Sequence, residues 1–290
     1  MDAGLSRQVE FSTRDGLTLR ADWFGEPSSQ PVILVHGGGQ TRHSWGGTAE
    51  VLASRGWAAI PYDQRGHGDS DFSPEANYHL TAFSTDLQDV ARSLDPAPVV
   101  VGASLGGLAG MLVEGEIEPD LFAGLVLVDI TPRQEAIGVE RIIQFMLDKA
   151  DVGFGSLEEV ADAIAAYQPH RDRPENLDGL KKNLRLGADN RWRWHWDPLL
   201  FNDTNGLGAS QSAERLMEAA AAIAIPTLLV RGKLSDLVSE ETAREFLEIA
   251  PHADYVDVTD AGHMVAGDRN DRFTEAVVHF LDRLAAMRST

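Results

Sequence analysis

Hydrophobic positions follow two alternating patterns along the first 130 residues. Short continuous apolar runs, such as residues 31–35 and 125–128, are typical of strands buried on both faces of a sheet. Segments such as residues 81–94 separate these runs, and their apolar positions recur every three or four residues, as on one face of a helix. Alternating strands and helices predict a mostly parallel sheet covered by helices on both faces.

Each run also predicts the bounds of an element. The two opening strands lie within residues 8–24 and are joined by a turn at Asp15-Gly16. Further strands are expected at residues 31–35, 58–62, 98–101, 125–128, 226–230 and 255–258. Helices are expected at residues 44–54, 81–94, 108–116 and 271–287.

The alternation stops between residues 132 and 222, where only helical patterns are found. One apolar stripe spans residues 139–150, and Ser156 with Glu159 forms a capping box before the next helix. Leucines from residue 177 to 184 and the alanine-rich segment 213–223 indicate two more helices. The sequence therefore predicts an α/β fold, a core domain of residues 1–131 and 224–290, and a helical cap of residues 132–223 inserted after the sixth strand.

Composition and charge narrow the class of protein. The 290 residues are 43% apolar, as in a globular protein, and contain no cysteine, which excludes disulfides, thiolate metal sites and cysteine nucleophiles. The net charge of -20, from 45 acidic and 25 basic residues, argues against nucleic acid and anionic membranes as partners. The chain opens without a basic, apolar leader and has no apolar run of the ~20 residues that a membrane span needs, so we expect a cytoplasmic protein. Its oligomeric state is not indicated.

The pentapeptide Gly-Ala-Ser-Leu-Gly at residues 102–106 carries the candidate nucleophile, Ser104. It lies between an expected strand and an expected helix, where a tight, strained turn would hold the hydroxyl out at the carboxyl end of the strand. Glycines suit this turn because strand and helix pack closely there.

A serine hydroxyl needs an adjacent base, and the base needs a carboxylate to fix its tautomer. His263 follows the last expected strand and is the candidate base. Asp236, after the strand at 226–230, is the preferred acid, because serine, acid and histidine then follow one another as in serine hydrolases built on such a sheet. Asp129, after the strand at 125–128, is the alternative acid, or it could bond backbone groups where the chain leaves the sheet.

Glycines at residues 37–39 follow another buried strand and His36. Glycines at such a strand end let backbone N–H groups approach a developing oxyanion, and we expect the hole to be formed by the N–H groups of Gly38 and Leu105. For His36 we expect a structural role, bonding backbone around this loop.

The chain resembles the α/β-hydrolase superfamily over nearly its full length. The resemblance rests on four stretches: His-Gly-Gly at 36–38, Asp-Gln-Arg-Gly-His-Gly-Asp-Ser at 63–70, Gly-Ala-Ser-Leu-Gly at 102–106 and Gly-His at 262–263. Epoxide hydrolases and haloalkane dehalogenases of this superfamily attack with an aspartate, so Ser104 makes those activities unexpected. The chain is similar to the capped esterases and to the cofactor-free haloperoxidases or perhydrolases.

Several residues are candidates for the substrate pocket. Gly39, His43 and Trp45 lie in or just after the expected oxyanion loop. Trp194 and Trp196 belong to an unusual run, Arg-Trp-Arg-Trp-His-Trp at 191–196, whose tryptophans either pin the cap to the core or line an apolar pocket under it.

The function expected from this pattern is hydrolysis of a small to medium carboxylic ester through an acyl-enzyme at Ser104. The alternatives are lactone, thioester or carbon–carbon bond hydrolysis or perhydrolysis by the same triad, and, in another class, a non-catalytic receptor. The expected partner is a small-molecule ester. No cofactor is implied, and no cluster of residues has convincing metal-ligand spacing.

Overall fold

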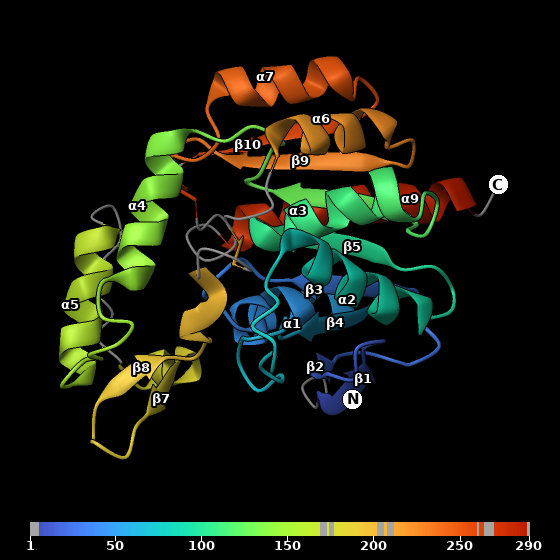
Figure 1. Ribbon diagram of the computed structural model, residues 1–290. Coiled ribbons are helices and arrows are strands. Elements are labelled where there is room, and N and C mark those ends of the chain that lie inside the picture. The colour runs from blue at the N-terminus through green and yellow to red at the C-terminus, as the bar shows by residue number, and fades with distance from the viewer. Residues whose placement is uncertain are drawn as a thin grey trace.

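An eight-stranded sheet forms the centre of the molecule, in the order β1-β2-β4-β3-β5-β6-β9-β10 (Figure 1). The computed structural model describes residues 6–168, 173, 177–201, 206–207, 212–259, 261–263 and 270–288. The strands are β1 Arg7–Ser12, β2 Thr18–Trp23, β3 Pro31–Val35, β4 Ala58–Tyr62, β5 Val99–Ala103, β6 Gly124–Val128, β9 Thr227–Gly232 and β10 Asp254–Val258. β2 pairs antiparallel with β1 and β4, and the other pairs are parallel.

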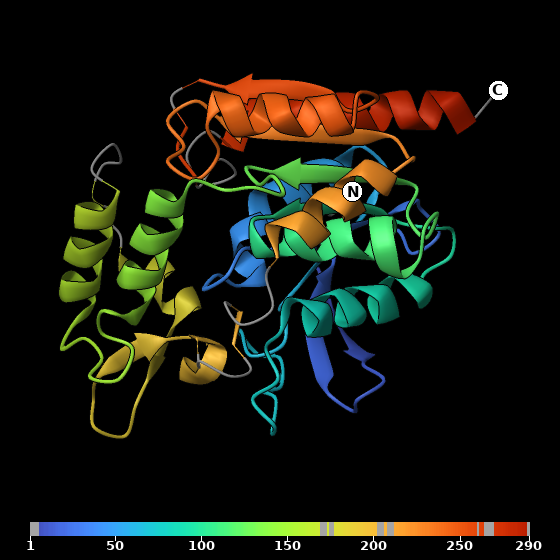
Figure 2. The same ribbon diagram turned by 45° about the horizontal axis from the view of Figure 1, so that its top comes forward.

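Helices cover both faces of this sheet, as Figures 1 and 2 show. On one face lie α2 Leu80–Arg92, α3 Leu105–Leu112 with the π-helical turn η2 Val113–Ile117, α6 Ala213–Ala222 and α7 Glu240–Ile249. On the other face lie α1 Gly46–Ser54, preceded by the 3-10 turn η1 Arg42–Trp45, and the long helix α9 Asn270–Arg288. The predicted α/β-hydrolase fold is confirmed.

The continuous apolar runs divide between two cores because successive strand side chains point to opposite faces. In β3, Ile33 and Val35 belong to the core under α2 and α3, whereas Val32 and Leu34 belong to the core under α1 and α9. Every side chain of β3 is buried, which is why the run has no polar position.

A cap segment lies beside the sheet, at the end toward which β6 and β9 point (Figure 1). It contains α4 Ala136–Leu147, α5 Leu157–Tyr167, η3 Leu177–Asn183, β7 Leu184–Leu186, β8 Trp192–Trp194 and η4 Pro198–Phe201. The expectation of helices alone in this segment is wrong, because β7 and β8 pair as an antiparallel hairpin. The alternation of Trp192 and Trp194 with arginines is the strand period: both indoles pack toward a small cap core that includes Phe154.

The predicted cap, residues 132–223, also includes α6, which packs on the core. Leu216 and Ala219 of α6 belong to the main core cluster, and Ala219 lies against Gly115 of η2. The predicted segment contains residues 169–172, 174–176, 202–205 and 208–211, which lie outside the described residues. The limits of the cap stay a prediction.

Backbone hydrogen bonds join the end of the hairpin to the core. Gly68 N–H donates to His195 O at 2.7 Å, and Asp197 N–H donates to Gly66 O at 2.8 Å. The Tyr78 hydroxyl donates to the Asp197 carboxylate at 2.5 Å.

Within the described part of the chain, no helix is both long and apolar enough to cross a membrane.

Candidate active site

Ser104 occupies a strained turn between β5 and α3. Its backbone has φ +46° and ψ -114°, a conformation that is costly for a residue with a side chain. The two glycines allow this turn: a Cβ at Gly102 would lie 2.5 Å from Gly106 O, and one at Gly106 would lie 2.6 Å from Val35 O. Strand, turn and helix therefore present Ser104 as the pentapeptide predicted.

His263 and Asp129 form a hydrogen-bonded pair close to this turn. His263 Nδ1 lies 2.8 Å from Asp129 Oδ2, and the Asp129 side chain is completely buried. Asp129 follows Val128, which pairs with Ala103, so Asp129 and Ser104 leave neighbouring strands side by side. The Asp129 backbone also has a positive φ, +47°. Ser104 and Asp129 therefore both have a positive φ where their neighbouring strands end, at the same edge of the sheet.

Asp236, the acid preferred from the sequence, is not the partner of His263. Its carboxylate lies 2.9 Å from an Arg141 guanidinium nitrogen of α4 and is 34% exposed. The loop after β9 turns so that Ser235, rather than Asp236, meets Asp129, while the Asp236 backbone packs against Gly138 of α4. The alternative acid, Asp129, is the one that the geometry places on the histidine.

The loop after β3 lies against the serine turn, as an oxyanion hole requires. A Cβ at Gly37 would lie 3.3 Å from Ser104 Cβ. The N–H of Gly37 donates to Gln40 Oε1, and that of Gly39 donates to His67 Nε2, both at 3.0 Å. Among the described residues, the N–H groups of Gly38 and Leu105 have no hydrogen-bond acceptor. These are the two amides expected to bind an oxyanion.

Two buried neutral histidines fix this loop. His36 donates from Nδ1 to Gly37 O at 2.8 Å and accepts the Gln64 N–H at 3.0 Å, as expected of a structural residue. His67 donates from Nδ1 to Arg65 O and accepts the Gly39 N–H, both at 3.0 Å. Burial lowers the pKa of His36 to about 4 and that of His67 to about 3, so both rings are neutral near pH 7.

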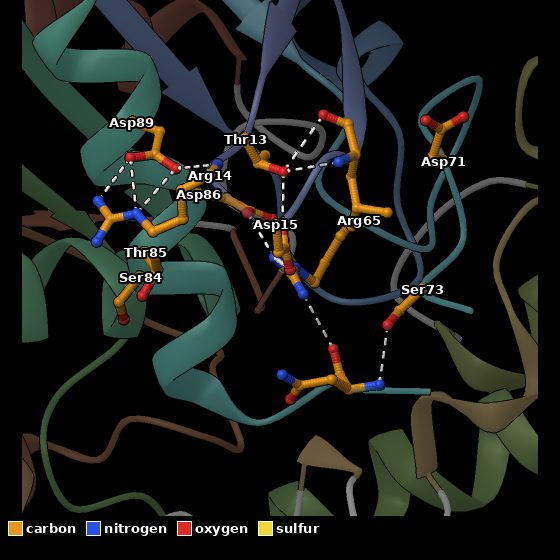
Figure 3. Close-up of polar contacts among 12 residues, drawn as sticks. Thr13, Arg14, Asp15, Arg65, Asp71, Ser73, Ser84, Thr85, Asp86 and Asp89 are labelled. Atoms are coloured by element: carbon orange, nitrogen blue, oxygen red, sulfur yellow. Dashed lines mark hydrogen bonds and ion pairs between the residues drawn. The ribbon is translucent and has the colours of Figure 1, made fainter. Parts of the chain in front are cut away.

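The turn at 63–70 is tied to its neighbours by ion pairs. Arg65 binds the Asp86 carboxylate of α2 through two bonds of 2.6 Å and the Asp15 carboxylate through one of 2.9 Å (Figure 3). Arg42, directly after the glycine loop that follows β3, binds the buried carboxylate of Asp63. Such bidentate, buried pairs fix geometry, and here they position the loop and the turn that flank Ser104.

Three of the residues predicted to line the substrate pocket lie in different places: on the loop after β3, at the surface and in the core. Gly39 lies on the loop after β3, where a Cβ would lie 2.5 Å from Met146 Cε of α4. His43 is exposed. Trp45 is wrong as a pocket residue: it is 1% exposed and packs on Phe273, in the core on the α1 and α9 face.

The two tryptophans of the hairpin segment serve packing. Trp194 lies between Phe145 and Phe154, with ring centroids 5.6 and 5.3 Å away. Trp196 is buried in the main core against Phe201, and its backbone forms a bridge with His67. Trp196 therefore pins the cap segment to the core, as one of the two interpretations of this run held.

Fold and site together define a hydrolase of the α/β type, and comparison with known proteins agrees. Residues 32–276 match the model of the alpha/beta hydrolase family, and the chain belongs to this family. It is 33% identical over 267 residues to the esterase Rv0045c of Mycobacterium tuberculosis, covering 90% of this chain and 85% of that protein. The chain is an esterase-like hydrolase.

Solved structures show the same likeness. An α/β hydrolase from Novosphingobium aromaticivorans superimposes with a TM-score of 0.82 at 25% identity, covering 97% of this chain and all of the other. The Mycobacterium tuberculosis esterase superimposes with a TM-score of 0.75 at 28% identity, covering 96% of this chain and 92% of the other.

Proposed function

We propose that the chain hydrolyses carboxylic esters through an acyl-enzyme, with Ser104, His263 and Asp129 as its catalytic triad. The observation that carries this proposal is the Asp129–His263 hydrogen bond at the strand end beside the Ser104 turn. A buried carboxylate on Nδ1 leaves Nε2 of the histidine as the basic nitrogen, which is the tautomer that a serine nucleophile needs.

In the proposed reaction, His263 Nε2 takes the hydroxyl proton as Ser104 Oγ attacks the ester carbonyl. The N–H groups of Gly38 and Leu105 bind the oxyanion, and the amino end of α3 adds positive partial charge. His263 then gives its proton to the departing alcohol. Water, deprotonated by His263, cleaves the acyl-enzyme and restores Ser104.

The proposed substrate is a carboxylic ester, because the similar Mycobacterium tuberculosis protein is an esterase. The small to medium size expected from the sequence stays a prediction. The cap segment approaches the site through Met146, which lies against Gly39. We therefore propose that the part of the cap segment around Met146 determines which acyl groups the site accepts. The cytoplasmic location expected from the sequence stays a prediction.

The test uses a fluorophosphonate probe and p-nitrophenyl acetate. We expect the probe to label Ser104 in the wild-type protein, and Ser104→Ala to lose both labelling and turnover while keeping its circular dichroism spectrum. Ser54→Ala, which alters an exposed serine at the end of α1, serves as the matched control and should behave as wild type. Turnover by Ser104→Ala at the wild-type rate would show that another residue is the nucleophile.

A further inference from the structure

Ser235 lies beside Asp129, in the loop that follows β9. Its hydroxyl is 2.6 Å from Asp129 Oδ2, the same oxygen that His263 Nδ1 approaches to 2.8 Å. The other oxygen, Oδ1, accepts the Gly232 N–H at 2.9 Å. From the described residues, the Asp129 carboxylate therefore receives three hydrogen bonds, and two of them come from the Gly232–Ser235 turn.

The direction of the Ser235 bond is fixed by its surroundings. Ser235 Oγ accepts the backbone N–H groups of Leu237 and Val238, both at 3.1 Å. Because these donors occupy the lone pairs of the hydroxyl oxygen, its hydrogen is directed to Asp129. A completely buried carboxylate gains most from such a donor, since no water competes for it.

We propose that Ser235 is a positioning residue for the reaction: it holds the Asp129 carboxylate in the orientation that binds His263. This inference rests on the proposed function, because it assigns Ser235 a role in the same triad. Without the hydroxyl, Oδ2 keeps just the His263 bond among the bonds that the described residues make to it, and the carboxylate is held against rotation about its last torsion by two bonds instead of three. Losing one donor also leaves more negative charge facing the imidazole, which favours its protonated form.

Charged groups near this turn are unchanged in the variants below. Arg231 donates to Val238 O at 2.7 Å and pairs with Asp257, and Asp236 pairs with Arg141. These groups contribute the same electrostatic field in wild type and in the variants. A shift of the pH–activity profile between these proteins therefore reports on the Ser235 hydroxyl itself.

The experiment compares Ser235→Ala and Ser235→Thr with Ser239→Ala. Ser239 caps α7 on the same loop and does not bond Asp129, so its variant is a control for lost capping. From the usual strength of a hydrogen bond to a charged group, we expect kcat of Ser235→Ala to fall about 10- to 100-fold, with KM within about threefold. The acidic limb of its kcat/KM profile should move to higher pH, whereas Ser235→Thr, which keeps a hydroxyl, should restore both towards wild type.

The outcomes separate the two proposals. If the fluorophosphonate labels Ser104 in every variant but Ser235→Ala matches Ser239→Ala in kcat and pH profile, the role of Ser235 is refuted and the proposed function stands. If wild type is not labelled at Ser104, the proposed function fails first. If Ser235→Ala does not fold, Ser235→Cys replaces it: its weaker donor should move the acidic limb in the same direction, and an unmoved limb overturns the inference.

Discussion

Replacing either candidate acid by asparagine separates the two possible triads. Three donors from the described residues converge on the Asp129 carboxylate, at 2.6, 2.8 and 2.9 Å. An asparagine offers one oxygen to them, and its NH₂ group must then face another donor. If that donor is His263 Nδ1, the ring loses the tautomer in which Nε2 accepts the serine proton. Loss of the acid in a serine triad lowers kcat by about 10⁴-fold, or roughly 5.4 kcal/mol in activation free energy.

Among the described contacts of the Asp236 side chain, the same change removes its ion pair with Arg141 alone. Both side chains of this pair are partly exposed, at 34% and 45%, and exposed ion pairs contribute about 0–1 kcal/mol. We therefore expect Asp129→Asn to lower kcat for p-nitrophenyl acetate about 10³- to 10⁴-fold, and Asp236→Asn to lower it less than about fivefold.

The assay is steady-state kinetics on both variants, with circular dichroism as the control for folding. A larger loss of kcat in Asp236→Asn than in Asp129→Asn would refute the assignment of Asp129 and restore the acid preferred from the sequence. Equal, small losses would show that no carboxylate supports the histidine.

Three further predictions follow from the same geometry. Both Ser104→Gly and Ser104→Ala should be inactive, but glycine relieves the φ of +46°, so its variant should be more stable by about 1 kcal/mol in urea unfolding; equal stabilities would contradict the strain. His67 has a pKa of about 3 when folded and an ordinary value of 6.5, so the unfolded state binds its proton first and stability falls as the pH drops below about 6.5. Between pH 6 and pH 5, the free energy of unfolding of His67→Gln should therefore fall by about 1 kcal/mol less than that of wild type. An equal fall in both proteins would mean that His67 is protonated in the fold. Trp45→Phe should lower stability by about 1–2 kcal/mol and leave KM unchanged, because Trp45 packs on Phe273; a raised KM would return it to the pocket.

The sheet could be predicted from the sequence because its central strands are buried on both faces. In β3 and β6, no side chain reaches solvent, so an uninterrupted apolar run was a sufficient signal. Ser104 was also predictable, because the close contact between Gly102 and Gly106 lies within the pentapeptide itself, although Gly106 also meets Val35 of β3. Both features leave a signal in a short stretch of sequence.

The carboxylate that contacts His263 and the location of Trp45 could not be predicted, because both depend on contacts between residues far apart in the sequence. Asp129 and Asp236 both follow buried strands, and only the path of the loop after β9 decides which carboxylate meets His263. Trp45 closely follows the loop after β3, but the turn η1 places its side chain in the core between the sheet and helices α1 and α9. Nearness in sequence to the site was misleading there.

The loop after β9 contacts the proposed catalytic acid, Asp129, at one end and the cap segment at the other. Gly232 and Ser235 bind Asp129, while Asp236 pairs with Arg141 of α4 and Leu237 O accepts the Glu135 N–H at 2.9 Å. A chimera that takes its cap from another member of the family would therefore replace one side of this junction. In such a chimera, residues 232–237 should be exchanged together with α4, because a mismatched junction would displace the loop that holds Asp129, the acid of the proposed triad.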